Sequence, residues 1–443
     1  MPRRTSLLVI MGAAAAAVTA CGGGGAAGNS GSLGSGASAV IKHIVVIVQE
    51  NRTPDNLFHG LPGADIADTG IDSKGQTITL QAGSLAESYD LSHSHDAFML
   101  MYDNGRMDGA DKVPVICKEP LCPPNAQFRY VDPGEVQPYF QLAQRYTFGD
   151  RMFETSQGPS FPAHQFIIAG TSAPSVGGIY GDYFVAENPS LLDPTGCGSP
   201  SHETVALIDP AGLESASTYP CFEHPTLMDS LDKAGISWRY YAPTPGLIWT
   251  APNAIQHLRT GKDWNNVIIP QSRVLTDIAA NELAQVVWVI PDGSASDHPA
   301  LNDGSGPSWV ASIVNAIGRS AYWKETAIII TWDDWGGWYD HVAPPIYNVY
   351  EYGFRVPLIV VSPYARSGYV SHVNHDFGSI LRFIETVFSL PTLGYADARA
   401  DDLSDCFDFT QTATTYVAVA SRYTARYFVE RARTTPPTDP DDD

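Results

Sequence analysis

The chain of 443 residues contains few basic side chains. It has 26 Lys and Arg against 48 Asp and Glu, a formal net charge of -22 at pH 7. A surface of this sign repels phosphate backbones, which excludes nucleic-acid binding by charge, and it disfavours anionic membrane surfaces for the same reason. Hydrophobic residues make up 44% of the chain, which excludes wholesale disorder and allows a large core.

Cysteine is also scarce, with 6 residues in the chain. The sequence has no Cys-x-x-Cys pair, which argues against a zinc–thiolate site. In an oxidising compartment we expect Cys117 to pair with Cys122 across a turn that contains proline. We expect Cys197 to pair with Cys221 around an insertion rich in Gly, Pro and Ser, and Cys406 then has no partner.

The first residues indicate that the chain is exported. A basic pair, an apolar run and small residues before Cys21 are typical of a signal peptide over residues 1–20. Cys21 directly follows Ala20 and precedes a run of glycines, so the junction resembles a bacterial lipobox and we favour lipidation of Cys21. We therefore expect a bacterial outer membrane lipoprotein or a periplasmic protein, with secretion as the alternative.

The rest of the chain divides by composition into three parts. Residues 21–40 are mostly Gly, Ala and Ser and predict a flexible tether, residues 41–432 predict one domain, and residues 433–443 predict a disordered acidic tail. Within the domain, residues 60–132 and 177–225 are rich in Gly, Pro and Asp. We interpret both segments as insertions that cover the active edge of the fold.

Strands and helices alternate along the predicted domain. Four runs rich in β-branched residues predict buried strands: Ile41–Gln49, Val286–Pro291, Thr326–Trp332 and Val356–Val361. Helical periodicity appears in Thr226–Gly235, Ser308–Arg319 and Ser379–Ser389. This alternation predicts an α/β fold with a largely parallel central sheet.

Polar residues follow the predicted strands at their carboxyl ends, where open α/β sheets bind ligands. Glu50 and Asn51 follow the first strand, Asp333 and Asp334 follow the third, and His298 lies beyond the second. Carboxylates that converge at one edge repel each other unless a cation neutralises them, so we predict a metal site. Oxygen ligands favour Mg, Mn or Ca, whereas adding His298 would let Zn or Fe compete.

A segment around Ser160 offers a reacting group for this metal. Pro162 suits the first turn of a helix, which would place Ser160 at the N-terminal end. Free backbone N–H groups and the helix dipole attract phosphate there. Ser160 could equally be only a helix cap, and the short pattern by itself favours neither role.

Five collinear blocks resemble the bacterial phosphoesterase family, which includes phospholipases C and related acid phosphatases within the alkaline-phosphatase-like superfamily. The blocks are Gln49–Phe58, Asp90–His93 with Asn104–Gly109, Gly158–Pro162, Trp332–Gly337 with Tyr339–His341, and Gly353–Pro357 with Ser362–Tyr364. The resemblance extends from Ile41 to about Phe409. It implies an alkaline-phosphatase-like sheet with helices on both faces.

The resemblance also implies roles for single residues. Glu50, Asn51, Asp333 and Asp334 match the metal ligands of the family, and Ser160 matches its nucleophile. Asn51 would also contact the phosphate.

Histidines are the other candidates for catalysis. His93 and His298 match family residues that line the phosphate pocket, and one of them would protonate the leaving alcohol. Asp108 lies in a block near this pocket, and His224 could reach the substrate from the exit of the second insertion. His164 is four residues beyond Ser160, so on a helix it could lie near the nucleophile, although we favour a packing role.

These residues predict a metal-dependent phosphoric ester hydrolase that acts through a phosphoserine. The family's phospholipases C usually carry Thr at the nucleophile position, so Ser160 favours an acid phosphatase-like phosphomonoesterase. A phospholipase C that cleaves phospholipid headgroups is the alternative, and a non-catalytic, metal-stabilised surface binding protein is the second one. The expected partner is accordingly a small phosphorylated substrate or a phospholipid.

Overall fold

The computed structural model describes residues 33–117 and 122–431. The predicted signal peptide, Cys21 and the predicted tail lie outside the described residues.

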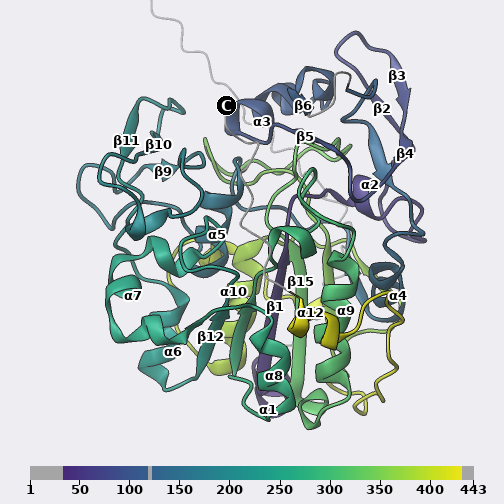
Figure 1. The fold of residues 1–443 in the computed structure, drawn as a ribbon, viewed down its shortest axis with the longest axis vertical. Coiled ribbons are helices and arrows are strands. Elements are labelled where there is room, and N and C mark those ends of the chain that lie inside the picture. Colours follow the sequence, from purple (N-terminus) through teal and green to yellow (C-terminus); the bar gives the residue numbers. More distant parts are fainter. Residues whose placement is uncertain (1–32, 118–121, 432–443) are drawn as a thin grey trace, which may run out of the picture. The chain divides into compact units, whose positions relative to one another are not determined.

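A sheet of eight strands forms the centre of the fold (Figure 1). In spatial order the strands are β13 (Val267–Ile268), β12 (Trp238–Tyr241), β14 (Val286–Val289), β1 (His43–Gln49), β15 (Thr326–Trp332), β16 (Leu358–Val361), β8 (Thr147–Gly149) and β17 (Tyr369–Ser371). The four strands predicted from apolar runs are β1, β14, β15 and β16. They lie next to one another and are almost entirely buried, as continuous β-branched runs require.

The pairing of the strands confirms the predicted α/β class. β1 runs parallel to β14 and β15, and β12 and β17 also pair in parallel with their neighbours β13, β14 and β8. β16 is the exception, because it runs antiparallel to β15 and β8. Gln49 lies opposite Trp332 in the register of β1 and β15, so the residues that follow both strands emerge together at the carboxyl edge.

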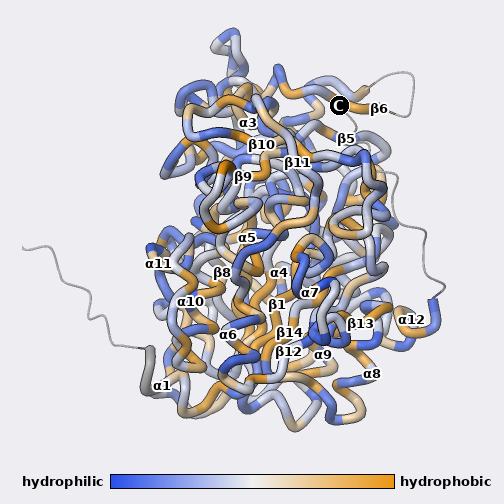
Figure 2. Tube along the Cα trace, turned by 90° about the vertical axis from the view of Figure 1, so that its left-hand side faces the viewer, coloured by the Kyte–Doolittle hydropathy of each residue, from blue (hydrophilic) through white to orange (hydrophobic). Residues whose placement is uncertain are grey.

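Helices cover both faces of the sheet, and Figure 2 shows α10 and α11 on one side of the strands with α8 and α12 on the other. The first layer contains α1 (Leu33–Val40), α5 (Ser160–Ala169), α6 (Leu227–Ala234), α10 (Phe377–Phe388) and α11 (Ala396–Arg399). The second layer contains α4 (Gln137–Arg145), α8 (Arg273–Ala279), α9 (Gly306–Gly318) and α12 (Ala425–Glu430). The three helices predicted from periodicity are α6, α9 and α10.

Shorter helices lie in the connections. They are α2 (Pro54–Leu57), α3 (His95–Tyr102) and α7 (Gln256–Thr260), and the 3-10 helices η1 (Asp103–Gly105), η2 (Ala110–Lys112), η3 (Gly196–Gly198), η4 (Ala251–Ala254), η5 (Lys262–Asn266), η6 (Gly293–Ala295), η7 (Ala321–Glu325) and η8 (Ser404–Cys406).

The two predicted insertions form small sheets above the carboxyl edge of the main sheet (Figure 1). The first contains β2 (Thr69–Ile71), β3 (Thr77–Thr79), β4 (Gln81–Gly83), β5 (Tyr89–Leu91), β6 (Val115–Cys117) and β7 (Arg129–Val131). The second contains β9 (Phe184–Val185), β10 (Val205–Ile208) and β11 (Ala216–Thr218).

Disulfides close a loop in each insertion. Cys117 is bonded to Cys122 and Cys197 to Cys221, which confirms both predicted pairs. Cys406 is a buried free thiol. Two disulfides are what an oxidising, extracytoplasmic compartment permits.

The end of the predicted tether differs from expectation, because α1 forms over Leu33–Val40 and packs against α10. Ala37 is fully buried, and a Cβ atom added at Gly36 would lie 3.2 Å from Phe409. The small side chains that suggest a linker thus also permit close packing of a helix. No helix in the described residues is both long and apolar enough to cross a membrane.

Candidate metal and nucleophile site

The register of β1 and β15 brings two acidic loops together. The backbone N–H of Asp333 donates to the carbonyl of Gln49 at 3.0 Å, and the backbone N–H of Asn51 donates to Asp333 Oδ1 at 3.2 Å. Asn51 has a φ of 60°, a left-handed conformation that Asn tolerates better than most residues. This turn directs Glu50 and Asn51 towards Asp333 and Asp334 at the buried edge.

Ser160 is the first residue of α5 and is buried beside these carboxylates. Its hydroxyl donates to Asp334 Oδ2 at 3.2 Å and to Glu50 Oε2 at 3.4 Å. The start of α5 offers fewer free backbone N–H groups for phosphate than the sequence suggested. Phe161 N–H donates to Asn188 Oδ1 at 2.9 Å, and Pro162 has no N–H. The helix start therefore acts on this hydroxyl mainly through its dipole.

His164 lies one helical turn beyond Ser160 and faces the same cluster. Its Nε2 is 3.2 Å from Glu50 Oε1 and 3.7 Å from Asp333 Oδ2. The i, i+4 spacing to Ser160 allowed this ring to lie near the nucleophile, and it faces the carboxylates beside Ser160. Packing, which we favoured, is therefore not its only contact.

The cluster holds an excess of buried negative charge. Burial, and then the charges of Asp333 and Asp334, raise the pKa of Glu50 well above its usual range. Among the described residues the ion-pair partner of Glu50 and Asp333 is His164, and burial lowers the pKa of its imidazole to about 4. No arginine or lysine of the described chain therefore neutralises these two groups.

The donor set fits a divalent cation. Asn51 Oδ1 and Asp333 Oδ2 are buried and have no hydrogen-bond partner in the described structure, which is costly unless a cation or water satisfies them. Glu50, His164 and Asp333 offer ligand atoms within 4.8 Å of one another. Buried carboxylate, amide and imidazole groups in this arrangement could hold a metal ion.

His93 adjoins this cluster through Asn51. The Asn51 side-chain amide donates to His93 Nε2 at 3.0 Å and to both carboxylate oxygens of Asp334 at 2.9 Å. His93 Nδ1 lies 2.9 Å from the carbonyl of Leu91, so this nitrogen carries the proton and Nε2 is the acceptor.

The His298 ring lies 5.8 Å from the His93 ring. Burial, followed by the His93 charge, lowers the pKa of His298 to about 3, which makes this ring neutral at ordinary pH. Its Nδ1 lies 2.8 Å from the carbonyl of Pro299. The proton therefore sits on Nδ1, and Nε2 carries the lone pair.

The two remaining candidates have contacts of another kind. Asp108 accepts from Arg106 Nε at 3.3 Å. His224 is buried, with Nδ1 3.1 Å from the carbonyl of Pro225. Neither contact involves the carboxylates, so a role for Asp108 or His224 in substrate binding stays a prediction.

Glu154 is a buried acid that the sequence did not suggest. One carboxylate oxygen accepts from the Phe354 backbone N–H at 3.0 Å. Burial, and then the charge of Asp334, raise its pKa well above the usual range. Glu154 stands in a connection between β8 and α5, where a single glutamate has no motif that distinguishes it from a surface residue.

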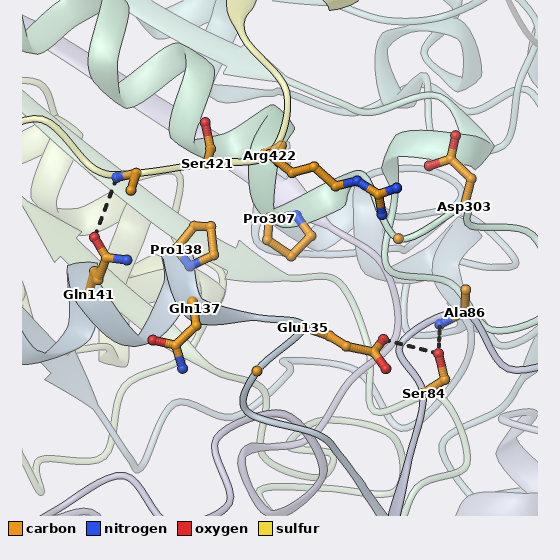
Figure 3. A pocket seen from close by; sticks show the side chains of 14 residues that line it. Ser84, Ala86, Glu135, Gln137, Pro138, Gln141, Asp303, Pro307, Ser421 and Arg422 are labelled. Carbon is orange, nitrogen blue, oxygen red and sulfur yellow. Dashed lines mark hydrogen bonds between the residues drawn. The ribbon is translucent and has the colours of Figure 1, made fainter.

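A cavity of about 600 Å³ lies away from this chemistry (Figure 3). Its walls come from the start of α4, the start of α9 and residues 420–422, with Glu135, Asp303 and Arg422 as charged side chains. None of the predicted site residues lines it. We therefore place the candidate site at the carboxylate cluster, where the chemistry converges.

Fold and site together define an α/β protein with a serine and a carboxylate cluster at the carboxyl edge of its sheet. The profile of the phosphoesterase family matches residues 41–391. The chain belongs to this family.

Relatives with curated names are phospholipases C. Hemolytic phospholipase C of Pseudomonas aeruginosa is 23% identical over 87% of this chain, which spans 58% of that protein's length. Phospholipase C A of Mycobacterium tuberculosis is 24% identical, and the aligned region covers 83% of this chain and 77% of the length of that protein. Non-specific phospholipase C6 of Arabidopsis thaliana is 24% identical, and the aligned region covers 82% of this chain and 72% of the length of that protein. These names favour the predicted alternative over the acid phosphatase.

Solved structures match only distantly. Ps i-CgsB has a TM-score of 0.40 at 9% identity and covers 82% of this chain, with 75% of its own length aligned. A protein in the alkaline phosphatase superfamily from Vibrio parahaemolyticus has a TM-score of 0.36 at 11% identity, with 83% and 72% covered. The fold class rests on the sheet described above.

Proposed function

We propose that the chain is a metal-dependent phosphoric diester hydrolase of the phospholipase C type, with Ser160 as its nucleophile. The observation that carries this proposal is the Ser160 hydroxyl at the start of α5, 3.2 Å from Asp334 and 3.4 Å from Glu50. The family and the names of the relatives support a phospholipid substrate. The two disulfides support an exported enzyme.

Five residues would hold the divalent ion: the predicted Glu50, Asn51, Asp333 and Asp334, together with His164. Oxygen ligands favour Mg, Mn or Ca, and the imidazole of His164 lets Zn or Fe compete. A bound ion supplies positive charge that stabilises an alkoxide and the oxygens of a phosphate.

The chain's own groups account for the two chemical steps. Ser160 Oγ gives its proton to Asp334 and attacks phosphorus, forming the Oγ–P bond while the bond from phosphorus to the diacylglycerol oxygen breaks. The departing oxygen takes up the proton held by Asp334 and leaves as the alcohol. Water then attacks the phosphoserine and releases the headgroup phosphate. The unprotonated Nε2 of His298 accepts the proton of that water, since this imidazole is neutral. Ser160 Oγ regains a proton as its bond to phosphorus breaks, which restores the hydroxyl.

A matched pair of serine variants tests the nucleophile. Ser160→Ala should lower kcat for p-nitrophenylphosphorylcholine by roughly a thousandfold or more. Ser156→Ala is the control, because Ser156 is buried in the same segment and its hydroxyl has no partner in the described structure. Full activity of Ser160→Ala, with thermal unfolding unchanged, would contradict the assignment.

The same assay separates the two ester classes. A phospholipase C hydrolyses phosphatidylcholine and p-nitrophenylphosphorylcholine faster than p-nitrophenyl phosphate. The opposite preference would favour the phosphomonoesterase that Ser160 suggested.

Chelation tests the metal. We expect a chelator to abolish all activity, and the metal whose addition restores activity identifies the ion.

A further inference from the structure

Large apolar side chains are exposed on the segments that surround the candidate site. They are Met99 on α3, Val176 and Ile179 before β9, Leu213 between β10 and β11, and Tyr347 and Val349 after the acidic loop of β15. Ile179 is 87% exposed and Leu213 is 60% exposed. We name these six residues the apolar rim.

The buried ring of Tyr350 joins the segments of the apolar rim. It lies 5.5 Å from the ring of His95 on α3 and 5.7 Å from the ring of Phe184 on β9. Its hydroxyl donates to the carbonyl of Ala186 at 2.8 Å. Figures 1 and 2 both show α3, β9, β10 and β11 at the same end of the molecule.

The hairpin between β10 and β11 belongs to the same group. A Cβ atom added at Gly212 would lie 3.7 Å from the side chain of Val349. Leu213 therefore protrudes next to the segment that carries Tyr347 and Val349.

The same segments contact the residues immediately before the nucleophile. Gly158 lies directly against the Tyr350 hydroxyl, with no room for a Cβ atom between them. Gln157 accepts at its carbonyl from His95 Nδ1 at 2.9 Å, and its side chain donates to the carbonyl of Glu351 at 3.2 Å. The apolar rim is thus attached to the segment that ends at Ser160.

We propose that the apolar rim inserts into the surface of a layer of zwitterionic phospholipids and so brings headgroups to Ser160. This proposal rests on the proposed function, since it supplies the route by which an insoluble substrate reaches the site. An exposed apolar surface of this kind marks a site of interaction. Burying loop-tip side chains at the boundary of headgroups and acyl chains gives reversible binding.

The shape and charge of the rim favour lipid over a protein partner. Its side chains come from three loops and one short helix, whereas protein interfaces need a closely packed, complementary face. A net charge of -22 opposes binding to anionic lipids. A neutral, deformable layer is therefore the occupant that fits both properties.

Two double variants of the full chain test the rim. Both double variants are made in a full chain that also carries Cys21→Ser, so that an acyl group at residue 21 cannot bind the vesicles. Ile179→Asp with Leu213→Asp changes the rim, and Val417→Asp with Val429→Asp is the matched control, because Val417 is 55% and Val429 is 43% exposed on the C-terminal segment. All four side chains are exposed, so the substitutions leave the core intact.

Sedimentation with phosphatidylcholine vesicles measures binding without any need for activity. We expect the rim variant to bind at least about tenfold more weakly than the control variant, and hydrolysis of vesicle lipid to fall in proportion. Turnover of soluble p-nitrophenylphosphorylcholine should not change. Unchanged vesicle binding by the rim variant overturns the proposal, and so does a stronger preference for phosphatidylglycerol vesicles.

Two further outcomes separate the rim from the proposed function. If soluble and vesicle substrates are hydrolysed and the rim variant behaves like the control, the rim proposal fails and the function stands. If the rim variant loses vesicle binding but no protein hydrolyses any phosphodiester, the function fails. A concentration-dependent dimer that only the rim variant disrupts would assign the rim to a second copy of the chain and overturn the lipid proposal.

Discussion

Two buried acidic clusters in this molecule differ in how their charge is balanced. In the first, Glu50 and Asp333 face His164, whose pKa burial lowers to about 4. In the second, the buried guanidinium of Arg355 donates to Asp340 at 2.9 and 3.1 Å and to Asp55 at 3.3 Å.

The second cluster has a further cation in His341, whose Nδ1 lies 2.8 Å from Asp55. Hydrogen bonding to Asp55 and the nearby acids overcome burial and raise the pKa of His341 to about 9. Both clusters place ligand atoms within 4.8 Å, so spacing alone does not distinguish them. The charge that the chain itself supplies does distinguish them: the second cluster contains a buried arginine, whereas the first has none among the described residues and is therefore the candidate metal site.

Removing one acid from the first cluster should give the largest effect. Asp333→Asn deletes a predicted ligand, and we expect kcat to fall by roughly a thousandfold or more. The metal-free variant should nevertheless unfold at a temperature no lower than the metal-free wild type, since the change relieves repulsion. Metal titration followed by thermal unfolding measures both, and a wild type that metal does not stabilise would break the comparison.

Removing the arginine from the second cluster should lower the stability of the fold without a direct effect on catalysis. Arg355→Met leaves Asp55 and Asp340 buried without their partner, a change that costs about 3–5 kcal/mol. Urea unfolding measures this loss. Added metal that restored the stability of this variant would show that the two clusters are interchangeable, contrary to our expectation.

The second cluster should also respond to alkaline pH. The folded pKa of His341, about 9, lies above the unfolded value, so its stabilisation is complete below about pH 6.5 and is lost as the pH rises through 9. Because the ring is partly exposed, we expect about 1–2 kcal/mol. The difference in unfolding free energy between wild type and His341→Gln should shrink from pH 7 to pH 10; a constant difference would contradict this pKa.

The exposed end of the second cluster should contribute least. Asp65 joins this cluster through His341, whose Nε2 lies 3.1 Å from Asp65 Oδ1, and it also pairs with Arg151 at 2.7 Å. The side chains of Asp65 and Arg151 are both 35% exposed. Asp65→Asn should therefore cost about 1 kcal/mol or less, and less still in high salt. If Asp65→Asn lowered the free energy of unfolding as much as Arg355→Met does, solvent would not be screening the ion pairs of Asp65, contrary to our expectation.

The sequence predicted those site residues whose positions follow from strand register. Glu50 and Asp333 could be expected together because they end two apolar runs that must be buried strands. His164 needed the actual direction of α5, since i, i+4 spacing fits packing as well as ligation. Glu154 could not be foreseen, because its burial depends on a backbone hydrogen bond to Phe354, 200 residues later in the chain.

Helix α1 leads into the amino end of β1, whereas α5, whose first residue is Ser160, and the small sheets of the two insertions lie towards the carboxyl end (Figure 1). The described domain therefore begins at the end of the sheet opposite the edge that carries the candidate site, so its first helix leaves that edge uncovered.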